Sequence, residues 1–406
     1  MKLADIIKQI RTWGFCGAWN ALRRKPHEFI IKKRLKKSFV KNRNTVPVPG
    51  MTIVAPISGA FSLSKTMRDF VIRLKDVNIP VQVFDTFFDG AKADKSDYKD
   101  LITPPDEFNL MKYTHTVEML TSPLPDKLPL KRCRIAFWEG LHGVLEVFPY
   151  LRDSYCVIAM SDFNAEYFRR ELPANVKVAK VVYPLMPLPI KVLDKSEARK
   201  KFGFAKDDFI VFYNFDNRAK GRKNIDGTLT AFANAFAGEK NCKLVLKING
   251  LGNEEKHDLD RKIESLGIAG QVTMMLKYLS EVDLYSLTNC CDVYISLHRA
   301  EGFGLGIAEA MQLGKAVIAT DYSANTEFCK ADNSILIPAN MIEVQDEGFI
   351  RHMKYWAEPD IDAAAEGLTF LRDNLMKCNE LGCKAKLFVE DHFSNNVFVQ
   401  SIKTIV

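Results

Sequence analysis

Hydrophobic and polar positions follow two patterns along this chain, and the change between them falls near residue 50. In the first 22 residues, apolar side chains recur at steps of one or three with charged residues between them, which is typical of one face of an amphipathic helix. From residue 51 onward, short runs rich in β-branched and aromatic residues alternate with longer amphipathic stretches. That alternation predicts an α/β architecture with parallel sheets.

The short apolar runs fall into two sets, separated by a segment at residues 183–190 that is punctuated by prolines. The first set predicts strands at 52–56, 81–84, 134–137, 155–160 and 176–182. The second set predicts strands at 209–213, 242–248, 272–276, 293–297 and 316–320. Two α/β domains joined near residue 187 are therefore expected, 45–186 and 187–392. A chain of 406 residues agrees with this division, since single cores stop growing at roughly 250–300 residues.

Charge separates the first 44 residues from the rest of the chain. Residues 1–44 hold thirteen Lys and Arg against two acidic residues, while the whole chain carries a net charge of +7, so the remainder is slightly acidic. Any polyanionic partner should therefore meet this N-terminal segment first, and the body does not resemble a nucleic-acid binder. An apolar stripe joined to clustered cations suits the interface of an anionic membrane. A helix packed on the protein's own surface is the alternative, and the sequence favours neither.

The distribution of cysteines and of long apolar runs indicates the cell compartment. Nine cysteines, an odd number without a Cys-x-x-Cys pair, predict reduced thiols in a protein core, and the adjacent Cys290 and Cys291 are interpreted as core residues with a redox pair as the alternative. The sequence contains no run of about 18 apolar residues, so no transmembrane helix is predicted. Charged residues also interrupt the first residues, where a secretory signal would need an apolar region. We expect a cytoplasmic protein that is peripheral on the cytoplasmic face of the membrane if residues 1–44 bind lipid.

The strongest candidate chemistry follows the strand expected at 293–297. Glycines at 302, 304 and 306 occupy the turn from that strand into a helix expected at 306–313. Such a turn exposes backbone N–H groups and the positive end of a helix, which bind phosphate. Glu301 precedes the helix and Glu309 lies about one turn inside it, so both carboxylates can accept hydrogen bonds from sugar hydroxyls in one site. Two solvated acids at an ordinary helix start are the alternative.

The stretch from Glu301 to Glu309 matches the E-x7-E motif of the retaining glycosyltransferases of the GT-B fold, and the chain resembles their large family GT4. The match extends to 297–299 upstream and to 310–311 and 316–328 downstream. The resemblance implies that Glu309 binds the nucleotide ribose and Glu301 the hydroxyls of the donor sugar. It also implies backbone contacts to sugar and phosphate from Phe303, Gly304 and Leu305.

A basic loop follows the strand expected at 209–213. Negative charge collects on the leaving diphosphate in the transition state of glycosyl transfer, and preorganised cations stabilise it. The family places an Arg and a Lys five residues apart in this loop, and Arg218 and Lys223 have that spacing. Lys220 and Arg222 offer competing registers, and a merely solvated basic loop is the alternative.

Two segments of the first domain also resemble elements of the family, and these matches are less specific than the E-x7-E match. The loop after the strand at 52–56 resembles the glycine loop that approaches the donor phosphates, but it lacks the usual second glycine, so Gly59 is a donor-site candidate with a tight turn as its rival. Trp138 and Glu139 resemble a Trp-Glu segment that lines the acceptor side. Both are speculative acceptor contacts, because a core Trp is the commoner case. Residues 277–281 occupy the place where the family's main chain reads the nucleobase, which leaves the base undetermined.

Taken together, the resemblance implies a GT-B architecture of two Rossmann-like domains, with a last helix at 393–405 that returns to the N-terminal domain. The implied reaction is retaining transfer of a sugar from a nucleotide-diphosphate sugar to a hydroxyl of a glycan or a lipid-linked acceptor. No cofactor and no metal are expected, since the cations of the basic loop take the electrostatic role that a metal would have. The rivals are an epimerase or phosphorylase of similar fold and a catalytically silent GT-B subunit that binds a partner transferase or glycan.

Overall fold

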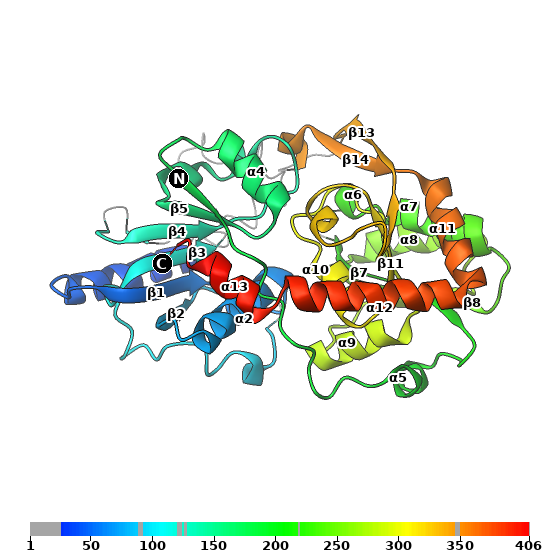
Figure 1. Cartoon of the computed structure of the whole chain (residues 1–406), viewed down its shortest axis with the longest axis horizontal. Coiled ribbons are helices and arrows are strands. Elements are labelled where there is room, and N and C mark those ends of the chain that lie inside the picture. Colours follow the sequence, from blue (N-terminus) through cyan, green and yellow to red (C-terminus); the bar gives the residue numbers. More distant parts are fainter. Residues whose placement is uncertain are drawn as a thin grey trace. The chain divides into compact units, whose positions relative to one another are not determined.

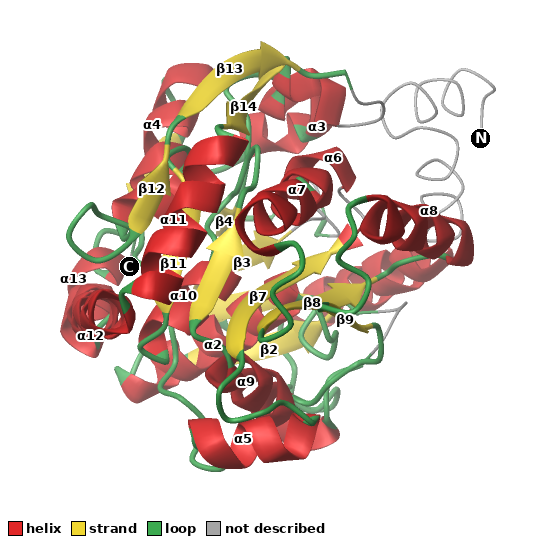
Figure 2. Cartoon of the chain, turned by 90° about the vertical axis from the view of Figure 1, so that its right-hand side faces the viewer, coloured by secondary structure: helices red, strands yellow, loops and turns green. Residues whose placement is uncertain are grey.

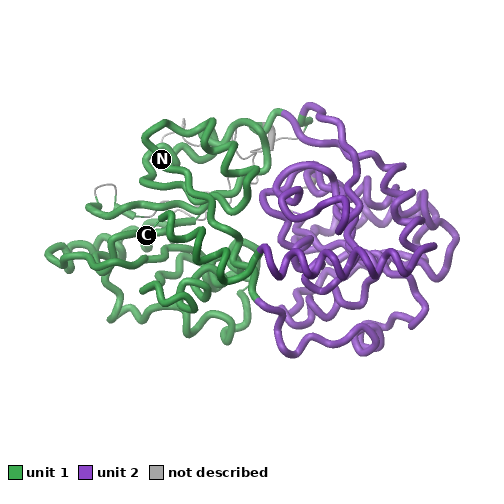
Figure 3. Tube along the Cα trace, viewed as in Figure 1, with its two compact units in different colours: residues 1–186, 344–354, 393–406 green, residues 187–343, 355–392 purple. Residues whose placement is uncertain are grey.

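The protein divides into two compact units. The structure is a computed structural model, and it describes residues 26–405 except 88–91, 120–123, 126–127, 218–219 and 346–349. Unit 1 comprises Met1–Met186, Val344–Lys354 and Phe393–Val406, and unit 2 comprises Pro187–Glu343 and Tyr355–His392 (Figure 3). The units divide after residues 186 and 392, where the sequence analysis also divided the chain. Residues 344–354 lie in unit 1, whereas the sequence pattern placed them in the C-terminal domain.

Packing explains why residues 344–354 belong to unit 1. Met353 is fully buried, and a Cβ atom built on Gly140 would lie 2.5 Å from the Met353 Cβ. The His352 Nδ1 atom lies 2.6 Å from Glu146 Oε2 on the same surface. Two glycines, at 140 and at 143, therefore make room for this segment, and neither hydrophobic periodicity nor motif spacing announces such a contact.

Unit 1 is built on a six-stranded parallel sheet in the order β2-β1-β3-β4-β5-β6. The strands are β1 (Val48–Ala55), β2 (Val81–Asp85), β3 (Tyr113–Met119), β4 (Lys131–Ile135), β5 (Cys156–Ala159) and β6 (Lys177–Lys180). The sequence analysis did not predict β3, because a carboxylate interrupts its apolar pattern. That residue, Glu118, is fully buried and ion-paired with Arg132 and Arg134 on the neighbouring β4.

Helices pack on the sheet of unit 1, and one of them comes from the C-terminal part of the chain. They are α2 (Ser62–Asp76), α3 (Val144–Val147), α4 (Asp162–Glu171) and α13 (Asn395–Ile402). Phe398 of α13 meets Phe70 of α2 edge-on at 6.0 Å, and the backbone N–H of Val182 donates to Ser401 Oγ at 3.1 Å. The C-terminal helix thus packs on unit 1, although it is shorter than the range 393–405 that we expected.

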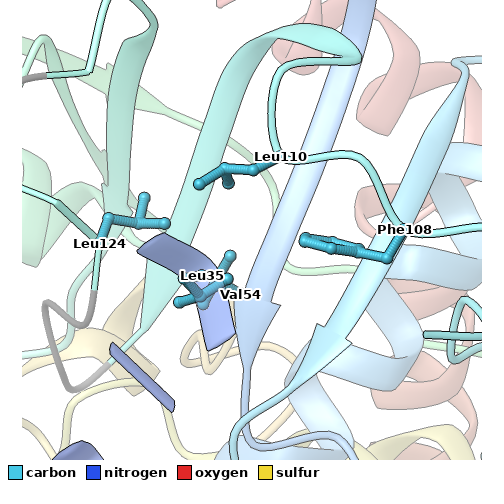
Figure 4. Close-up of a cluster of buried hydrophobic side chains, with 5 residues drawn as sticks. All are labelled: Leu35, Val54, Phe108, Leu110 and Leu124. Carbon is cyan, nitrogen blue, oxygen red and sulfur yellow. The ribbon is translucent and has the colours of Figure 1, made fainter. Parts of the chain in front are cut away.

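A helix over residues 26–42 packs on unit 1 by one face. Leu35 is fully buried in a cluster with Val54, Phe108, Leu110 and Leu124, to which Ile31 and Phe39 add from the same helix face (Figure 4). Its cations are exposed: Lys32, Lys33, Arg34, Lys36, Lys37, Lys41 and Arg43. This part of the N-terminal segment therefore packs on the protein itself and still presents a basic face. The helix expected in the first 22 residues lies outside the described residues.

Unit 2 holds a second six-stranded parallel sheet in the order β12-β11-β10-β7-β8-β9. Its strands are β7 (Phe209–Asp216), β8 (Cys242–Asn249), β9 (Val272–Met275), β10 (Val293–Ser296), β11 (Ala316–Thr320) and β12 (Ile335–Ile337). Read from β9, this is the 3-2-1-4-5-6 strand order of the Rossmann fold, in which the order reverses between the first and fourth strands. The switch point of unit 2 therefore lies between β7 and β10.

Eight helices accompany this sheet in the described part of unit 2. They are α5 (Lys195–Phe202), α6 (Lys220–Lys223), α7 (Ile225–Phe236), α8 (Asn253–Ser265), α9 (Glu281–Cys290), α10 (Leu305–Gln312), α11 (Ile361–Asp373) and α12 (Leu375–His392). Helix α12 runs beside α10 and β11 (Figure 1), and α7 packs against α11 (Figure 2). An antiparallel hairpin of β13 (Ala339–Glu343) and β14 (Tyr355–Pro359) completes the unit.

Cysteine burial agrees with the expectation of core thiols. Among the described cysteines, all but Cys383 are buried and none forms a disulfide, and Cys290 and Cys291 are fully buried. Burial raises the pKa of the Cys291 thiol to about 12, so this sulfur stays protonated. In the part of the chain that the structure describes, each helix is either too short or too polar to cross a bilayer.

Candidate functional site

The loops that leave β7 and β10 meet at the switch point of unit 2. The two strands pair in parallel, with Val293 opposite Val211, so both run out at the same edge of the sheet. Beyond that edge, the chain after β7 forms the single turn α6 and the chain after β10 leads to Glu301. The backbone N–H of Arg299 donates to the carbonyl of Arg222 at 2.8 Å, which joins the two loops directly. Ligands of open α/β sheets bind at this position of the fold.

Two cations of the α6 turn hold the carboxylate of Glu301. Lys223 Nζ is hydrogen-bonded to Glu301 Oε2, and Arg222 Nη1 lies 3.6 Å from Oε1. All three side chains are largely buried, with exposed fractions of 11–15%. Burial opposes ionisation of this carboxyl, but Lys223 and Arg222 outweigh it and hold the pKa of Glu301 well below its usual range. Glu301 is therefore a carboxylate at neutral pH, and it accepts hydrogen bonds.

The turn between Glu301 and α10 brings a helix N-terminus to the same place. Gly304 is the N-cap residue with φ of 93°, a left-handed conformation that favours glycine, and α10 begins at Leu305. At Gly306 an added Cβ would lie 2.3 Å from the Tyr294 hydroxyl, so only glycine lets this helix start so close to β10. The first N–H groups of such a helix carry partial positive charge and can bind an anion.

Glu309 lies one turn inside α10 and is oriented by a tyrosine of α9. Its Oε1 accepts a hydrogen bond of 3.0 Å from the hydroxyl of Tyr285, and it is 8% exposed. The sequence did not point to Tyr285, because a tyrosine in a helix 24 residues upstream carries no local signal that it reaches Glu309. Glu301 and Glu309 thus belong to one end of the sheet but are held by different elements.

A buried polar network supports the loop that carries Glu301. His298 is fully buried, with Nε2 3.0 Å from Asn325 Oδ1 and Nδ1 3.0 Å from Ser296 Oγ. Burial lowers the pKa of His298, so its ring is neutral at physiological pH. The backbone N–H of Glu301 donates to Ser323 Oγ at 3.0 Å. These contacts fix the loop before any ligand arrives.

Phe303 and Leu305, which were also predicted to contact the donor, lie at the turn into α10. Phe303 is buried against Phe328, with ring centroids 5.4 Å apart, so only its backbone is available to a ligand. Leu305 is the first residue of α10. Asn224, which follows Lys223, caps α7 by accepting from the Gly227 N–H. Arg218 lies outside the described residues.

Gly59 occupies the corresponding loop of unit 1, after β1 and beside the point where the strand order reverses between β1 and β3. Arg68 Nη1 donates to the carbonyls of Ile57 and Gly59 at 2.8 and 2.7 Å. The carboxylate of Asp85 accepts from the Ile57 N–H at 2.8 Å and from the Ser58 hydroxyl at 2.6 Å. Two charged side chains therefore hold this loop through its backbone.

The geometry of Trp138 supports a core role. It is 1% exposed, its indole N–H donates to the His142 carbonyl at 2.7 Å, and its ring meets Phe148 edge-on at 6.0 Å. The ring is therefore enclosed by protein in the structure, and the acceptor contact at Trp138 stays a prediction. Its neighbour Glu139 is partly exposed and stays a candidate.

Among the residues that the structure describes, no group of three or more His, Cys, Asp and Glu side chains is placed to hold a metal ion. The expectation that the reaction needs no metal and no cofactor stays a prediction.

Comparison with known proteins identifies one domain. Residues 194–374 match the family described as "Glycosyl transferases group 1". This part of the chain is therefore similar to that family. It contains both loops of the switch point, including Lys223, Glu301 and Glu309. The predicted resemblance is confirmed at this level.

Similar proteins extend the comparison. The Bacillus subtilis protein EpsD is 30% identical over 151 residues, which cover 37% of each chain, so the chain spans well under two thirds of that relative. The Dictyostelium discoideum alpha-1,3/1,6-mannosyltransferase ALG2 is 21% identical over 81% of this chain and 79% of its own. HepE of Anabaena, in a structure with UDP and glucose, superposes with a TM-score of 0.62 at 15% identity over 88% of this chain and 99% of its own. Together with the two parallel sheets, these likenesses confirm the GT-B fold class.

Proposed function

We propose that the chain is a retaining glycosyltransferase similar to family GT4, which moves a sugar from a nucleotide-diphosphate sugar to an acceptor hydroxyl. The observation that supports this proposal is the Lys223–Glu301–Arg222 cluster at the switch point of a domain similar to the glycosyl transferases group 1 family. The cluster places cations, a carboxylate and a helix N-terminus together, as cleavage of a sugar–diphosphate bond requires.

Each group has a proposed role in the reaction. Lys223, with Arg218 from the same loop, stabilises the charge that develops on the leaving β-phosphate. Glu301 accepts hydrogen bonds from the hydroxyls of the donor sugar and keeps Lys223 in place. Glu309 binds the ribose, with its carboxylate oriented by Tyr285. The acceptor hydroxyl attacks the anomeric carbon from the same face as the leaving group, and its proton passes to the departing phosphate oxygen. The anomeric configuration is thereby retained, and the fixed cations replace a divalent metal.

The names of similar proteins support a nucleotide-sugar donor without selecting one. HepE binds UDP and glucose in its solved structure, and ALG2 is named a mannosyltransferase. A thermal-shift series with UDP, GDP and ADP sugars on the full chain will identify the base. A stabilising shift with a single base is the expected result.

A variant of Glu309 tests the proposal directly. We expect Glu309→Ala to reduce donor turnover by at least about 10²-fold, since a buried carboxylate that orients the donor is lost. Glu264→Ala, in α8 outside the switch point, is the matched control. Anomeric analysis of the product by NMR tests retention, and unchanged rates in EDTA test metal independence. Donor binding without turnover on a panel of glycan and lipid acceptors would favour the silent-subunit alternative.

The acceptor is proposed to be a glycan or a lipid-linked molecule at an anionic membrane. The support is the basic outer face of helix 26–42, whose opposite face is anchored in unit 1 by Leu35. Deleting residues 1–44 would remove Leu35 from that cluster, so charge reversal is the cleaner test. We expect Lys33→Glu with Lys37→Glu to weaken binding to phosphatidylserine vesicles by at least about 30-fold in a sedimentation assay, since each lost cation contributes roughly 1 kcal/mol near the surface. Equal sedimentation of the variant and wild type would refute membrane binding by this face.

A further inference from the structure

The α6 turn that carries Lys223 is too short to hold its own conformation. It spans only Lys220–Lys223, and one isolated helical turn is unfavourable in water because nucleation fixes several residues for few hydrogen bonds. Arg222 and Lys223 of this turn nevertheless point at Glu301. Something outside the turn must therefore fix it.

The backbone of the loop after β10 provides one part of that support. Arg299 N–H donates to the Arg222 carbonyl at 2.8 Å, and Arg222 Nη1 donates back to the Ala300 carbonyl at 2.9 Å. The two loops are thus connected in both directions, immediately before Glu301.

The side chain of Arg299 provides the other part. Its Nη1 donates to the Gly221 carbonyl at 2.7 Å, in the middle of the α6 turn. The other side of the guanidinium forms a two-point pair with Glu358 of β14, through Nε and through Nη2 at 2.9 Å. The same group lies 5.2 Å from the centre of the Trp356 ring. One planar guanidinium therefore joins the turn to the β13–β14 hairpin.

The β13–β14 hairpin also binds Arg299 through its own backbone. Ala357 N–H donates to the Arg299 carbonyl at 2.9 Å, and Trp356 is only 5% exposed. Five backbone pairs hold β14 to β13, from Ala339 with Pro359 to Glu343 with Tyr355. The hairpin therefore contacts Arg299 through both its backbone and its side chains.

We propose that Arg299 is a positioning residue for transfer, which orients Lys223 toward the leaving phosphate by bridging the α6 turn and the β13–β14 hairpin. This inference rests on the proposed function, because that function gives the cation its role in transfer. The contacts of Arg299 themselves do not depend on it. Arginine is required because only a planar fork can meet a carbonyl and a carboxylate at once, whereas a lysine ammonium is a single point on a flexible stem. A cation displaced by about 1 Å can cost about 10²-fold in rate.

The first test compares two Arg→Lys variants that both keep the charge. Arg299→Lys should lower kcat by about 10- to 100-fold with the donor KM within about threefold, because the lost alignment matters most when phosphate charge develops. Arg372→Lys is the matched control, since Arg372 also pairs with a carboxylate, Glu239, and lies 5.4 Å over a ring, Phe236. Equal losses of kcat in both variants would show a merely structural role and overturn the proposal.

A double-mutant cycle shows whether Arg299 acts through the lysine. In a Lys223→Ala background, Arg299→Lys should cause little further loss of kcat, because the group that it positions is absent. The same fractional loss in both backgrounds would mean that Arg299 acts independently of Lys223, and the proposal would fail.

A chemical readout keeps the test valid even for a chain without measurable turnover. Acetylation of Lys223 by an N-hydroxysuccinimide ester, followed by mass spectrometry, measures how firmly the amine is held by Glu301. It should proceed about tenfold faster in Arg299→Lys and in Glu358→Gln than in wild type, and at the wild-type rate in Arg372→Lys. Unchanged Lys223 reactivity in Arg299→Lys would overturn the positioning role, whereas absent turnover in wild type would refute the proposed function alone.

Discussion

The two switch points of the molecule are built from similar strands but use their charged residues differently. In unit 2, Lys223 and Arg222 face Glu301, and all three charges meet beyond the sheet edge. In unit 1, Arg68 and Asp85 turn to the backbone of the Gly59 loop, where they bind carbonyl and N–H groups. In unit 2 the charges thus pair with one another at the proposed donor site, whereas in unit 1 they fix the backbone of a loop.

The difference predicts which substitutions matter at each switch point. Removing charge should be most damaging in unit 2, where a transition-state anion would be stabilised. Changing volume or a backbone hydrogen bond should matter most in unit 1, where the loop presents main chain.

Loss of the Lys223 amine should have the largest effect. We expect Lys223→Ala to lower kcat by about 10²- to 10³-fold, because one preorganised donor at a developing charge contributes on that scale. Steady-state kinetics with the donor found by thermal shift will measure it. Lys256→Ala, which breaks a 2.6 Å pair with Asp260 on α8, is the control and should keep its kcat. A decrease in kcat of less than threefold for Lys223→Ala would contradict a role for this charge in the reaction.

Added volume at Gly59 tests the shape-based account of unit 1. A Cβ atom there would lie 2.5 Å from the Phe61 ring and from Ser64 Oγ, so the loop must shift. We expect Gly59→Ala to raise the donor KM by about tenfold, which is about 1.4 kcal/mol of binding, with a smaller change in kcat. Gly270→Ala is the control, because its added Cβ would meet no atom within 4 Å. A KM equal to that of the control would contradict a role for this loop in donor binding.

Removal of the Asp85 carboxylate should weaken unit 1 without a large change in chemistry. Its Oδ1 also accepts from the Phe87 N–H at 3.0 Å, so Asp85→Ala leaves several backbone donors without their acceptor. We expect a loss of about 1–3 kcal/mol in the free energy of unfolding, measured in urea. Asp94→Ala, which removes an exposed acceptor of the Ser96 N–H, should leave the urea midpoint unchanged.

The smallest effect is a pH dependence that belongs to unit 2. The folded pKa of Glu301 is depressed from an ordinary value of 4.5, so the pair contributes stability above that value and loses it as pH falls toward the folded pKa. We expect Glu301→Gln to be less stable than wild type at pH 7, and the difference to narrow between about pH 5 and pH 3. Urea midpoints across that range will show it, and a gap that widens on acidification would contradict the depressed pKa.

Much of the fold could be predicted because parallel strands buried on both faces are continuous apolar runs. All ten expected strands overlap observed strands, from β1 to β11. The strand β3 was missed because the charge of Glu118 is neutralised by residues of β4, which only the pairing brings near. The β13–β14 hairpin was missed because β13 is mostly exposed and has no apolar face to detect.

The candidate site could be predicted only where it is local in sequence. The turn into α10 and the spacing that selects Lys223 are local patterns, and the structure brings Lys223 and Glu301 together. The contacts that orient them are not local: Tyr285 reaches Glu309 across 24 residues, and Glu358 reaches Arg299 across 59. The core position of Trp138 was also undetectable, since a buried and a ligand-facing indole have the same sequence signature.

The hairpin has a practical consequence for dissecting the molecule. Because residues 344–354 belong to unit 1 while β13 and β14 belong to unit 2, the chain passes from one unit to the other four times, and no single cut separates them. Glu343 and Tyr355 are cross-strand partners, so a two-residue Asn-Gly turn could replace the eleven-residue excursion. Residues 187–392 with that graft would form a minimal donor-binding fragment, a candidate for crystallisation with nucleotides and for fusion to other acceptor domains.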